Sequence, residues 1–468
     1  MNELVRDIPI VIEARRTRLQ RLGDWMREHR GAIQAVQWLV VVFYLGLLIW
    51  PALLPLPREY AHFYENLVLF AQFLFWGLWW PFVMLSMLLL GRVWCGVFCP
   101  EGSLSEWASR HGRGGAIPRW MRWGGWPFTA FVLTTIYGQL ISVYEYPKAA
   151  LLILGGSTIA AMLVGFLYGR GKRVWCRHLC PANGVFSLLS RLAPVHFRVD
   201  TAAWRQASPR TPAVDCAPLV NIRDMRGNSA CHMCGRCSGH RDAIVLSARA
   251  PNQEIVSLRD RDASPWDAML LIFGLLGVAT GAFQWSASPW FVQLKQGVAE
   301  WLIERDIYWP LGNDAPWWLL THYPETNDVF TWLDGALILF YIGTTTLVIG
   351  GSLLLALRLA GWLLGRRAMP WRLAYGLTPL AGISVFLGLS ALTIAFLKAE
   401  RIGLTWVPGL RAVLLLVAVL WSGWLLWRLL AAEGGNAMAF NRRAIAWLCL
   451  MAATVPVLWS WVVMFYFW

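Results

Sequence analysis

Charged side chains are scarce in this sequence. Only 15% of its 468 residues are Asp, Glu, Lys or Arg, whereas soluble domains average about 25%. Hydrophobic residues make up 57%, and the mean hydropathy is +0.48. Several apolar runs reach about 20 residues, which is long enough to cross a bilayer. This excludes an ordinary soluble protein and predicts an all-α polytopic membrane protein.

Other absences narrow the function. The apolar runs contain no histidine, and no C-x-x-C-H motif occurs. Haem of the b or c type is therefore not expected, since each needs one of these features. Flavin and nucleotide signatures are also missing, and charged residues are nearly absent from the run interiors, which argues against a pump or transporter. The net charge of +14 does not indicate nucleic-acid binding, because the arginines cluster at the ends of apolar runs.

Nine membrane spans are predicted, with a small polar insert between the fourth and fifth. The predicted spans are 33–54, 66–90, 126–144, 148–168, 266–287, 334–360, 373–397, 409–430 and 444–466. They divide the chain into an N-terminal segment, a four-helix unit, a polar insert and a five-helix region with an outer loop. The respective ranges are 1–32, 33–196, 197–265 and 266–468, and the outer loop is 288–330.

Lysine and arginine set the expected orientation. Seven arginines lie within 1–32 and fifteen lysines and arginines within 169–265, whereas 288–330 has two basic residues against six acidic ones. By the positive-inside rule, the N-terminus and the insert face the cytoplasm and the C-terminus lies in the periplasm of a bacterial inner membrane. We expect no cleavable signal peptide, because the N-terminal segment has no apolar core.

Eight of the nine cysteines fall on the predicted cytoplasmic side, in short clusters. Structural disulfides are rare in that compartment, so clustered thiols there indicate metal binding. The ninth, Cys449, stands alone in the last predicted span, where we expect a small apolar core residue.

The insert carries three cysteines on one tight loop, Cys231-x2-Cys234-x2-Cys237. This spacing is typical of a [4Fe–4S] cluster whose fourth ligand comes from elsewhere in the chain. Cys216 lies upstream and suits that role. A zinc site with four cysteines is the alternative, although zinc usually takes two C-x2-C pairs.

The other four clustered cysteines belong to a repeated phrase at the ends of two predicted spans. RVWCGVFCP occupies 92–100, and RVWCRHLCP occupies 173–181. A helical C-x3-C pair places both sulfurs on one helix face, and the following proline tends to end the helix. The four thiols could hold a second [4Fe–4S] cluster or another redox site, form reactive pairs, or be small buried residues. They are Cys95, Cys99, Cys176 and Cys180.

The insert resembles the second half of a bacterial two-cluster ferredoxin. Such a ferredoxin has cysteines at the positions held here by Gln206, Pro209, Pro212 and Arg241. The resemblance therefore implies that one cluster is lost and the other kept. His240 is a further candidate for the fourth ligand of the retained cluster.

The double C-x3-C-P motif followed by this insert resembles the polyferredoxin-type membrane iron–sulfur proteins of the NapH, NosR and CcoG group. The resemblance covers about residues 33–250. It implies an electron-transfer component linked to quinol oxidation, nitrous-oxide or nitrate respiration, or cytochrome oxidase assembly. The chain departs from the group in keeping one ferredoxin cluster where two are usual, and in the added spans of 266–468.

These patterns predict a membrane electron-transfer protein, as a subunit of a quinone-linked oxidoreductase complex. Electrons would pass between a cytoplasmic ferredoxin or dehydrogenase and the membrane quinone pool or a respiratory complex. The acidic, Trp-rich loop 288–330 predicts an amphipathic helix at the membrane surface, or a docking site for a membrane or periplasmic subunit such as a cytochrome. The alternatives are a redox-active assembly factor for a membrane oxidase or reductase, and a structural subunit with a zinc-stabilised domain.

Overall fold

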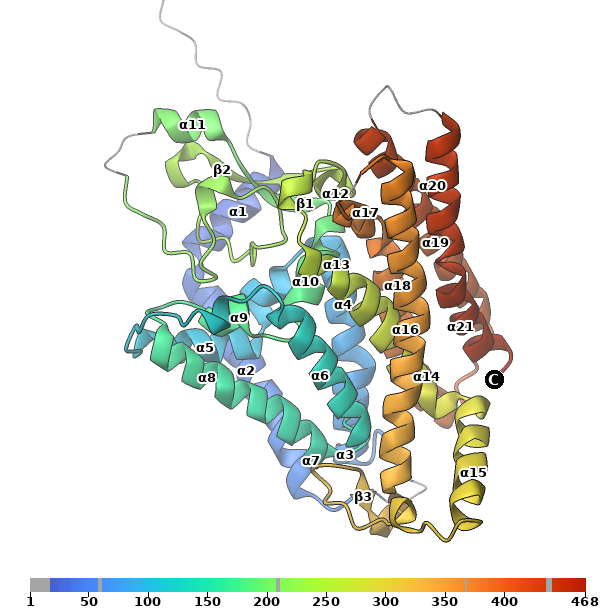
Figure 1. The fold of residues 1–468 in the computed structure, drawn as a ribbon. Helices are drawn as coiled ribbons and strands as arrows, with labels where there is room; N and C mark the ends of the chain where they lie inside the picture. Colours follow the sequence, from blue (N-terminus) through green and yellow to red (C-terminus); the bar gives the residue numbers. More distant parts are fainter. Residues whose placement is uncertain (1–16, 58–60, 208–210, 367, 435–439) are drawn as a thin grey trace, which may run out of the picture.

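The membrane-spanning helices dominate the computed structural model, which describes residues 17–57, 61–207, 211–366, 368–434 and 440–468. Within these ranges, eight helices are long and apolar enough to cross a membrane. They are Arg30–Leu53 (α2), Leu67–Leu90 (α3 and α4), Pro147–Tyr168 (α7 and α8), Pro265–Ala287 (α13 and α14), Trp332–Leu363 (α16), Trp371–Ala399 (α17 and α18), Val407–Ala432 (within α19) and Phe440–Tyr466 (α20 and α21). The chain is therefore an α-helical polytopic membrane protein, as predicted (Figure 1).

Several spans consist of two helical segments. These segments are α3 (Leu67–Gln72), α4 (Trp80–Leu90), α7 (Pro147–Ala150), α8 (Gly156–Tyr168), α13 (Pro265–Met269), α14 (Ala279–Gln284), α17 (Trp371–Ala374), α18 (Thr378–Ala399), α20 (Phe440–Ala452) and α21 (Val455–Tyr466); α19 is Val407–Gly434. Shorter helices flank the spans. They are α1 (Arg18–Glu28), α5 (Pro100–Arg110), α6 (Trp126–Leu140), α9 (Val174–His178), α10 (Asn183–Leu189), α11 (Thr201–Gln206), α12 (Gln253–Val256) and α15 (Pro289–Ile303).

Wide π-type helical turns join the two segments of three spans. They occupy Phe73–Trp79, Leu151–Gly155 and Leu270–Val278. Such turns are rare, and those that occur are frequently found at functional sites. The widened backbone moves side chains away from their regular helical positions. Two of these three stretches, Phe73–Trp79 and Leu151–Gly155, line one cavity.

The structure differs from the prediction of nine full spans at residues 126–144. The helix there, α6, has only 15 residues and measures about 22 Å, which is short for a hydrocarbon core of about 30 Å. The helix ends at Leu140 because the chain turns at Ser142, whose φ is +48°. Helices α10, α13, α14 and α16 pack against α6.

The helices run between two ends of the molecule, which we call the insert face and the loop face (Figure 1). The insert face carries an antiparallel pair of strands, β1 (Val195–Val199) and β2 (Ile244–Ala248), in the register Val195↔Ala248. The loop face carries α15 and a small pair, β3 (His322–Tyr323) and β4 (Asp328–Val329). The backbone N–H of Thr321 donates to the carbonyl of Leu140, which fixes the end of α6 at the loop face.

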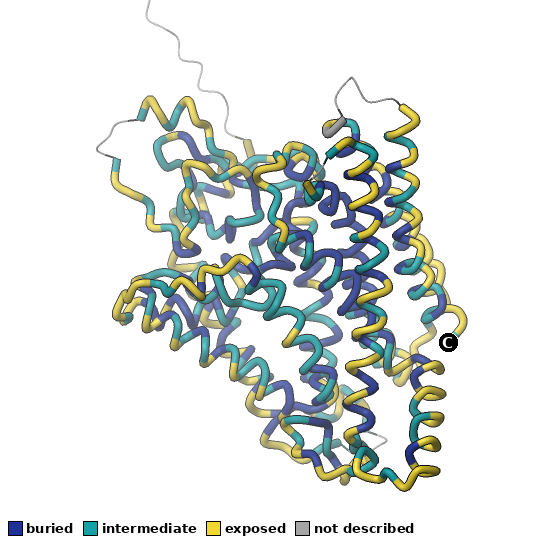
Figure 2. The backbone as a smooth tube through the Cα atoms, in the orientation of Figure 1, coloured by how far each residue is buried: buried dark blue, intermediate teal, exposed yellow. Residues whose placement is uncertain are grey.

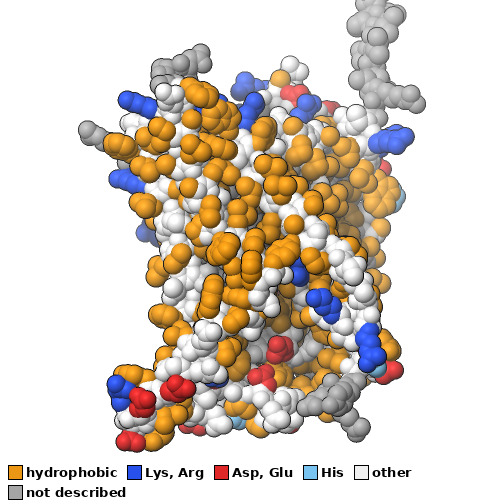
Figure 3. Space-filling model, turned by 90° about the vertical axis from the view of Figure 1, so that its right-hand side faces the viewer, with side chains coloured by type: hydrophobic (Ala, Val, Ile, Leu, Met, Phe, Trp, Pro, Cys, Tyr) orange, Lys and Arg blue, Asp and Glu red, His pale blue; other side chains and the backbone are white. Residues whose placement is uncertain are grey.

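The largest apolar core lies where α4, α10, the α13–α14 span and α18 meet. Figure 2 shows this region as the most continuously buried part of the backbone. Leu188, Leu270 and Leu380 are fully buried there. Apolar side chains cover the middle of the outer surface in Figure 3, with most of the charged side chains at its two ends. This is the distribution expected of a chain surrounded by lipid.

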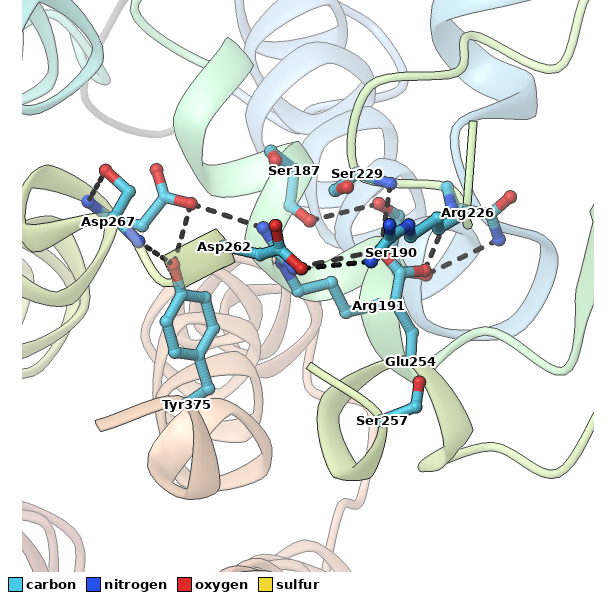
Figure 4. Close-up of polar contacts among 12 residues, drawn as sticks. Ser187, Ser190, Arg191, Arg226, Ser229, Glu254, Ser257, Asp262, Asp267 and Tyr375 are labelled. Carbon is cyan, nitrogen blue, oxygen red and sulfur yellow. Dashed lines mark hydrogen bonds and ion pairs between the residues drawn. The ribbon is translucent and has the colours of Figure 1, made fainter. Parts of the chain in front are cut away.

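Arg191 clamps the insert to the membrane helices (Figure 4). Its buried guanidinium lies 3.8 Å from Glu254 of α12, 3.3 Å from Asp267 of α13, and over the ring of Tyr375. Glu254 in turn pairs with Arg249 at 2.7 Å and accepts a hydrogen bond from the backbone N–H of Asn228. The segment that leads into the cysteine triad is thus held through one buried carboxylate.

We expect Glu254→Gln to loosen the insert and lower the free energy of unfolding by about 1–3 kcal/mol, because buried Arg191 and Arg249 lose their charge partner. Hydrogen exchange of residues 195–248 measures the effect. Asp262→Asn is the matched control: its side chain is 34% exposed, and surface pairs contribute at most about 1 kcal/mol. Equal protection of residues 195–248 against hydrogen exchange in the wild type and in Glu254→Gln would contradict this role of Glu254.

Candidate iron-sulfur sites

The first copy of the repeated phrase forms a single wide helical turn followed by a helix cap. Trp94–Phe98 is the turn and contains the buried Cys95. Cys99 is the N-cap of α5, where its sulfur accepts a hydrogen bond from the backbone N–H of Gly102 at 3.4 Å. Pro100 occupies the first helical position, where a missing N–H costs nothing.

The second copy has a regular α-helical turn in place of the wide one, and the next helix, α10, has Ala182 as its N-cap. Cys176 is buried in the short helix α9, and Cys180 follows its end. In both copies the backbone N–H of the second cysteine donates to the carbonyl of the repeated tryptophan: Cys99 to Trp94 at 2.8 Å and Cys180 to Trp175 at 3.0 Å. The sequence predicted that each C-x3-C pair would lie on one helix. In the structure neither pair does, because each second cysteine lies just beyond the end of its helical turn.

The four cysteines of the two copies lie near one another. A Cβ placed on Gly102 would lie 3.5 Å from the sulfur of Cys99 and 3.6 Å from that of Cys176. Burial raises the pKa of Cys180, and the nearby Glu101, Cys176, Cys99 and Cys95 raise it further. The structure therefore brings the four predicted thiols together, and we call them the repeat group.

Burial also raises the pKa of Cys176, to about 12, although Arg173 acts in the opposite direction. A thiolate in such a place needs positive charge to stabilise it, which a bound metal cluster supplies. All nine cysteines are free thiols. The repeat group thus offers four thiols, two of them buried, which is the donor type and number expected of a [4Fe–4S] site.

The cysteines of the insert form a second such group, the insert group. Cys216, Cys231, Cys234 and Cys237 line one small enclosed cavity. Burial raises the pKa of Cys231 to about 12, and the thiols of Cys234 and Cys216 add to the shift. The loop reverses tightly around the cavity, with φ of +52° at Met233. All three cysteines of the triad line this cavity.

Among the described residues, which include all nine cysteines, no three His, Cys, Asp or Glu side chains are close enough to hold a single metal ion.

Two other sequence candidates lie outside both groups. His240 stacks edge-on against Trp204 at 5.4 Å and borders the surface groove described below, not the cavity of the insert group. Cys449 lies in α20 of the C-terminal bundle. The structure does not bring either residue to a cluster position.

Gly96 joins the two groups through direct backbone contact. A Cβ on this residue would lie 2.1 Å from the carbonyl oxygen of His232 and 2.9 Å from the backbone nitrogen of Cys234. The triad loop therefore rests on the residue next to Cys95. The second copy contacts the other part of the insert group, because the backbone N–H of Arg173 donates to the carbonyl of Ala217 at 2.8 Å.

Two buried arginines stand between the groups, and the sequence analysis did not assign them a role. Arg92 and Arg173 are 2% and 1% exposed. Arg92 donates to the carbonyl of Ser229 at 2.7 Å and lies 3.8 Å from the sulfur of Cys95. Arg173 interacts electrostatically with both Cys176 and Cys234. The sequence did contain a sign of their importance, because each arginine begins one copy of the repeated phrase RVWC.

Glu106 of α5 balances this positive charge. Its carboxylate accepts a hydrogen bond from Arg173 at 2.8 Å and pairs with Arg236 of the triad loop and with Arg110. Burial alone would raise the pKa of Glu106, but the guanidiniums of Arg173 and Arg236 hold it at about 2. Glu106 therefore stays ionised and ties both cysteine groups to α5.

The fold and these two groups define a membrane-spanning protein with two adjoining candidate iron–sulfur sites. A family described as "4Fe-4S binding domain" matches residues 72–118 and 152–200. Each matched stretch contains one copy of the repeated phrase. The chain is also 23% identical over 233 residues to the Escherichia coli (strain K12) protein "Putative electron transport protein YccM".

That alignment covers 43% of this chain and 62% of the relative's length. No solved structure matches the chain. The similarities support iron–sulfur electron transfer as the class of function. They do not distinguish the NapH, NosR and CcoG group from other iron–sulfur electron-transfer proteins.

Proposed function

We propose that this protein carries electrons between a cytoplasmic redox partner and the membrane quinone pool, through two [4Fe–4S] clusters. Cys95, Cys99, Cys176 and Cys180 would hold one cluster, and Cys216, Cys231, Cys234 and Cys237 the other. When bound, each cluster supplies a reversible one-electron step. The observation that carries the proposal is the contact between the groups, since Gly96 places the backbone of one against that of the other.

Residues of the chain place positive charge next to both the repeat group and the insert group. Arg92 and Arg173 are held without solvent between the groups, and net charge near a cluster is a main determinant of its reduction potential. Buried guanidiniums favour the more negative, reduced state. Arg177, the counterpart of Gly96 in the second copy, is exposed.

A groove on the insert face offers a place for the cytoplasmic partner. It has a volume of about 610 Å³ and reaches Cys234 of the insert group. Four arginines line the groove against two acidic residues, Glu106 and Asp215. The arginines are Arg27, Arg30, Arg110 and Arg236. This charge suits an acidic electron carrier such as a ferredoxin, which would be steered to the groove electrostatically. The positive-inside pattern supports a cytoplasmic location for this face.

Iron quantitation and EPR of the reduced protein test the proposal. We expect about eight irons per chain, the content of two [4Fe–4S] clusters. Cys95→Ala with Cys176→Ala should remove one EPR signal and about half of the iron, and Cys231→Ala with Cys234→Ala should remove the other half. Cys449→Ala, outside both groups, is the control and should change neither. Zinc without iron in the purified wild type would overturn the proposal.

A further inference from the structure

A cavity among the spanning helices ends at the repeat group. Its volume is about 250 Å³, and Cys99, Glu101 and Cys180 lie along one end. The walls come from α2, the α3–α4 span, α6, the α7–α8 span, α14 and α18. We call it the inner cavity. It approaches the size range of small-molecule pockets, about 300–1,000 Å³.

The inner cavity is lined mostly by apolar and aromatic side chains. Trp76 and Trp79 come from the wide turns of Phe73–Trp79, and Leu154 comes from those of Leu151–Gly155. The widened turns thus supply facing walls of one space. Trp79 continues toward the repeat group, since its ring lies 5.1 Å from that of Trp94, the residue before Cys95.

Polar groups are few and have spare hydrogen-bonding capacity. Trp80 lines the inner cavity, and its buried indole N–H has no partner among the described residues. Tyr144 also lines it, and within the described residues its hydroxyl makes no hydrogen bond. A buried donor without a partner costs about 1–3 kcal/mol, so these groups favour a ligand with acceptor oxygens over a hydrocarbon chain.

A second cavity adjoins the first on the side of the loop face. It has a volume of about 790 Å³. Trp76, Tyr144, Phe283 and Leu389 line both cavities, so the two are adjacent. The second cavity is more polar, and we call it the vestibule. Its polar lining includes Gln139, Ser142, Glu145, Lys295, Gln296 and Asp328.

We propose that the inner cavity binds the ring of a lipophilic quinone, and that the vestibule gives the ring access from the loop face. The inference deepens the proposed function, on which it rests, by naming the binding site and the side from which it opens. Tryptophan rings provide stacking surfaces for a flat ring. Trp80 and Tyr144 would supply the donors for the carbonyl oxygens of a quinone.

The occupant is distinguished from a lipid by its chemistry. A phospholipid acyl chain would fill the same apolar space but leave the donors of Trp80 and Tyr144 unpaired. A charged, water-soluble carrier would not enter, because the walls of the inner cavity offer no basic side chain. A quinone satisfies both conditions, with an apolar body and two acceptor oxygens.

Photolabelling of the detergent-solubilised full-length protein with a short-chain azidoquinone, mapped by mass spectrometry, tests the proposal. We expect labels within 75–80 and 131–138, displaced by ubiquinone-1 but not by excess phospholipid. Thr135→Trp places a large ring in the inner cavity and should reduce labelling at least tenfold. Leu133→Trp is the matched control on α6, since Leu133 is 60% exposed on the outer surface. It should label like the wild type.

Tyr144→Phe keeps the test decisive if Thr135→Trp does not fold. Loss of one hydrogen bond should weaken displacement by ubiquinone-1 about fivefold. Labelling that phospholipid displaces equally, or that neither variant changes, would overturn the site. Iron content is measured on the same samples: absent iron with intact labelling would refute the proposed function alone, and intact iron without labelling would refute the site alone.

Discussion

Gly96→Ala is expected to lose about half of the bound iron while the membrane helices stay folded. The added Cβ would lie 2.1 Å from the carbonyl oxygen of His232 and 2.9 Å from the backbone nitrogen of Cys234. Both are backbone atoms, so no side-chain rotation relieves the overlap, and the triad loop must move. Cys234 moves with it, and the insert group loses its geometry. Iron content and the EPR spectrum measure the loss, and far-UV circular dichroism reports the helices.

Gly46→Ala is the control for this prediction. Gly46 lies in α2, and a Cβ there would meet nothing within 4 Å. This variant should retain all of its iron and gain slightly in helix stability. If Gly96→Ala also keeps full iron content and an unchanged EPR spectrum, the two groups do not meet at this backbone contact.

Arg173→Met is expected to destabilise the protein by about 3–5 kcal/mol, the usual result of removing one partner from a buried ion pair. Glu106 loses its hydrogen bond from the Arg173 side chain, and the carbonyl of Cys95 loses a donor as well. We expect the melting temperature in detergent to fall by about 5 °C or more. Arg173→Lys should recover only part of this, because a lysine cannot reproduce the geometry of two guanidinium bonds.

Arg170→Met serves as the matched control, since Arg170 is an exposed arginine close to Arg173 in the chain. Its substitution should change the melting temperature by less than about 1 °C, as expected for a surface position. An equal fall in both variants would show that the buried position of Arg173 contributes nothing special.

Hydropathy predicted most of the spans well, because each long apolar run must bury its backbone polar groups in a helix. The predicted span 334–360, for example, corresponds to α16, Trp332–Leu363. The same reasoning overestimated 126–144, since apolar composition does not reveal that Ser142 turns the chain. A helix shielded by neighbouring helices can also be shorter than the bilayer.

Cysteine spacing indicated the triad of Cys231, Cys234 and Cys237, because a short ligand loop is a local feature. The contact between the groups is not local, and the spacing of Gly96 or Arg173 from any cysteine gives no hint of it. The repeated arginines were visible in the sequence, but only the structure shows that they are buried between two sets of sulfurs. Their placement depends on how the insert folds back onto the spans.

The difference between Gly96 and Arg177 has a consequence for how the chain folds. A duplicated unit with equivalent ends could offer the insert two similar docking places. A residue without a side chain admits the triad loop at the first copy, whereas an exposed arginine stands at the matching position of the second. The two copies are therefore not equivalent for the insert, and we expect the triad loop to select the first copy.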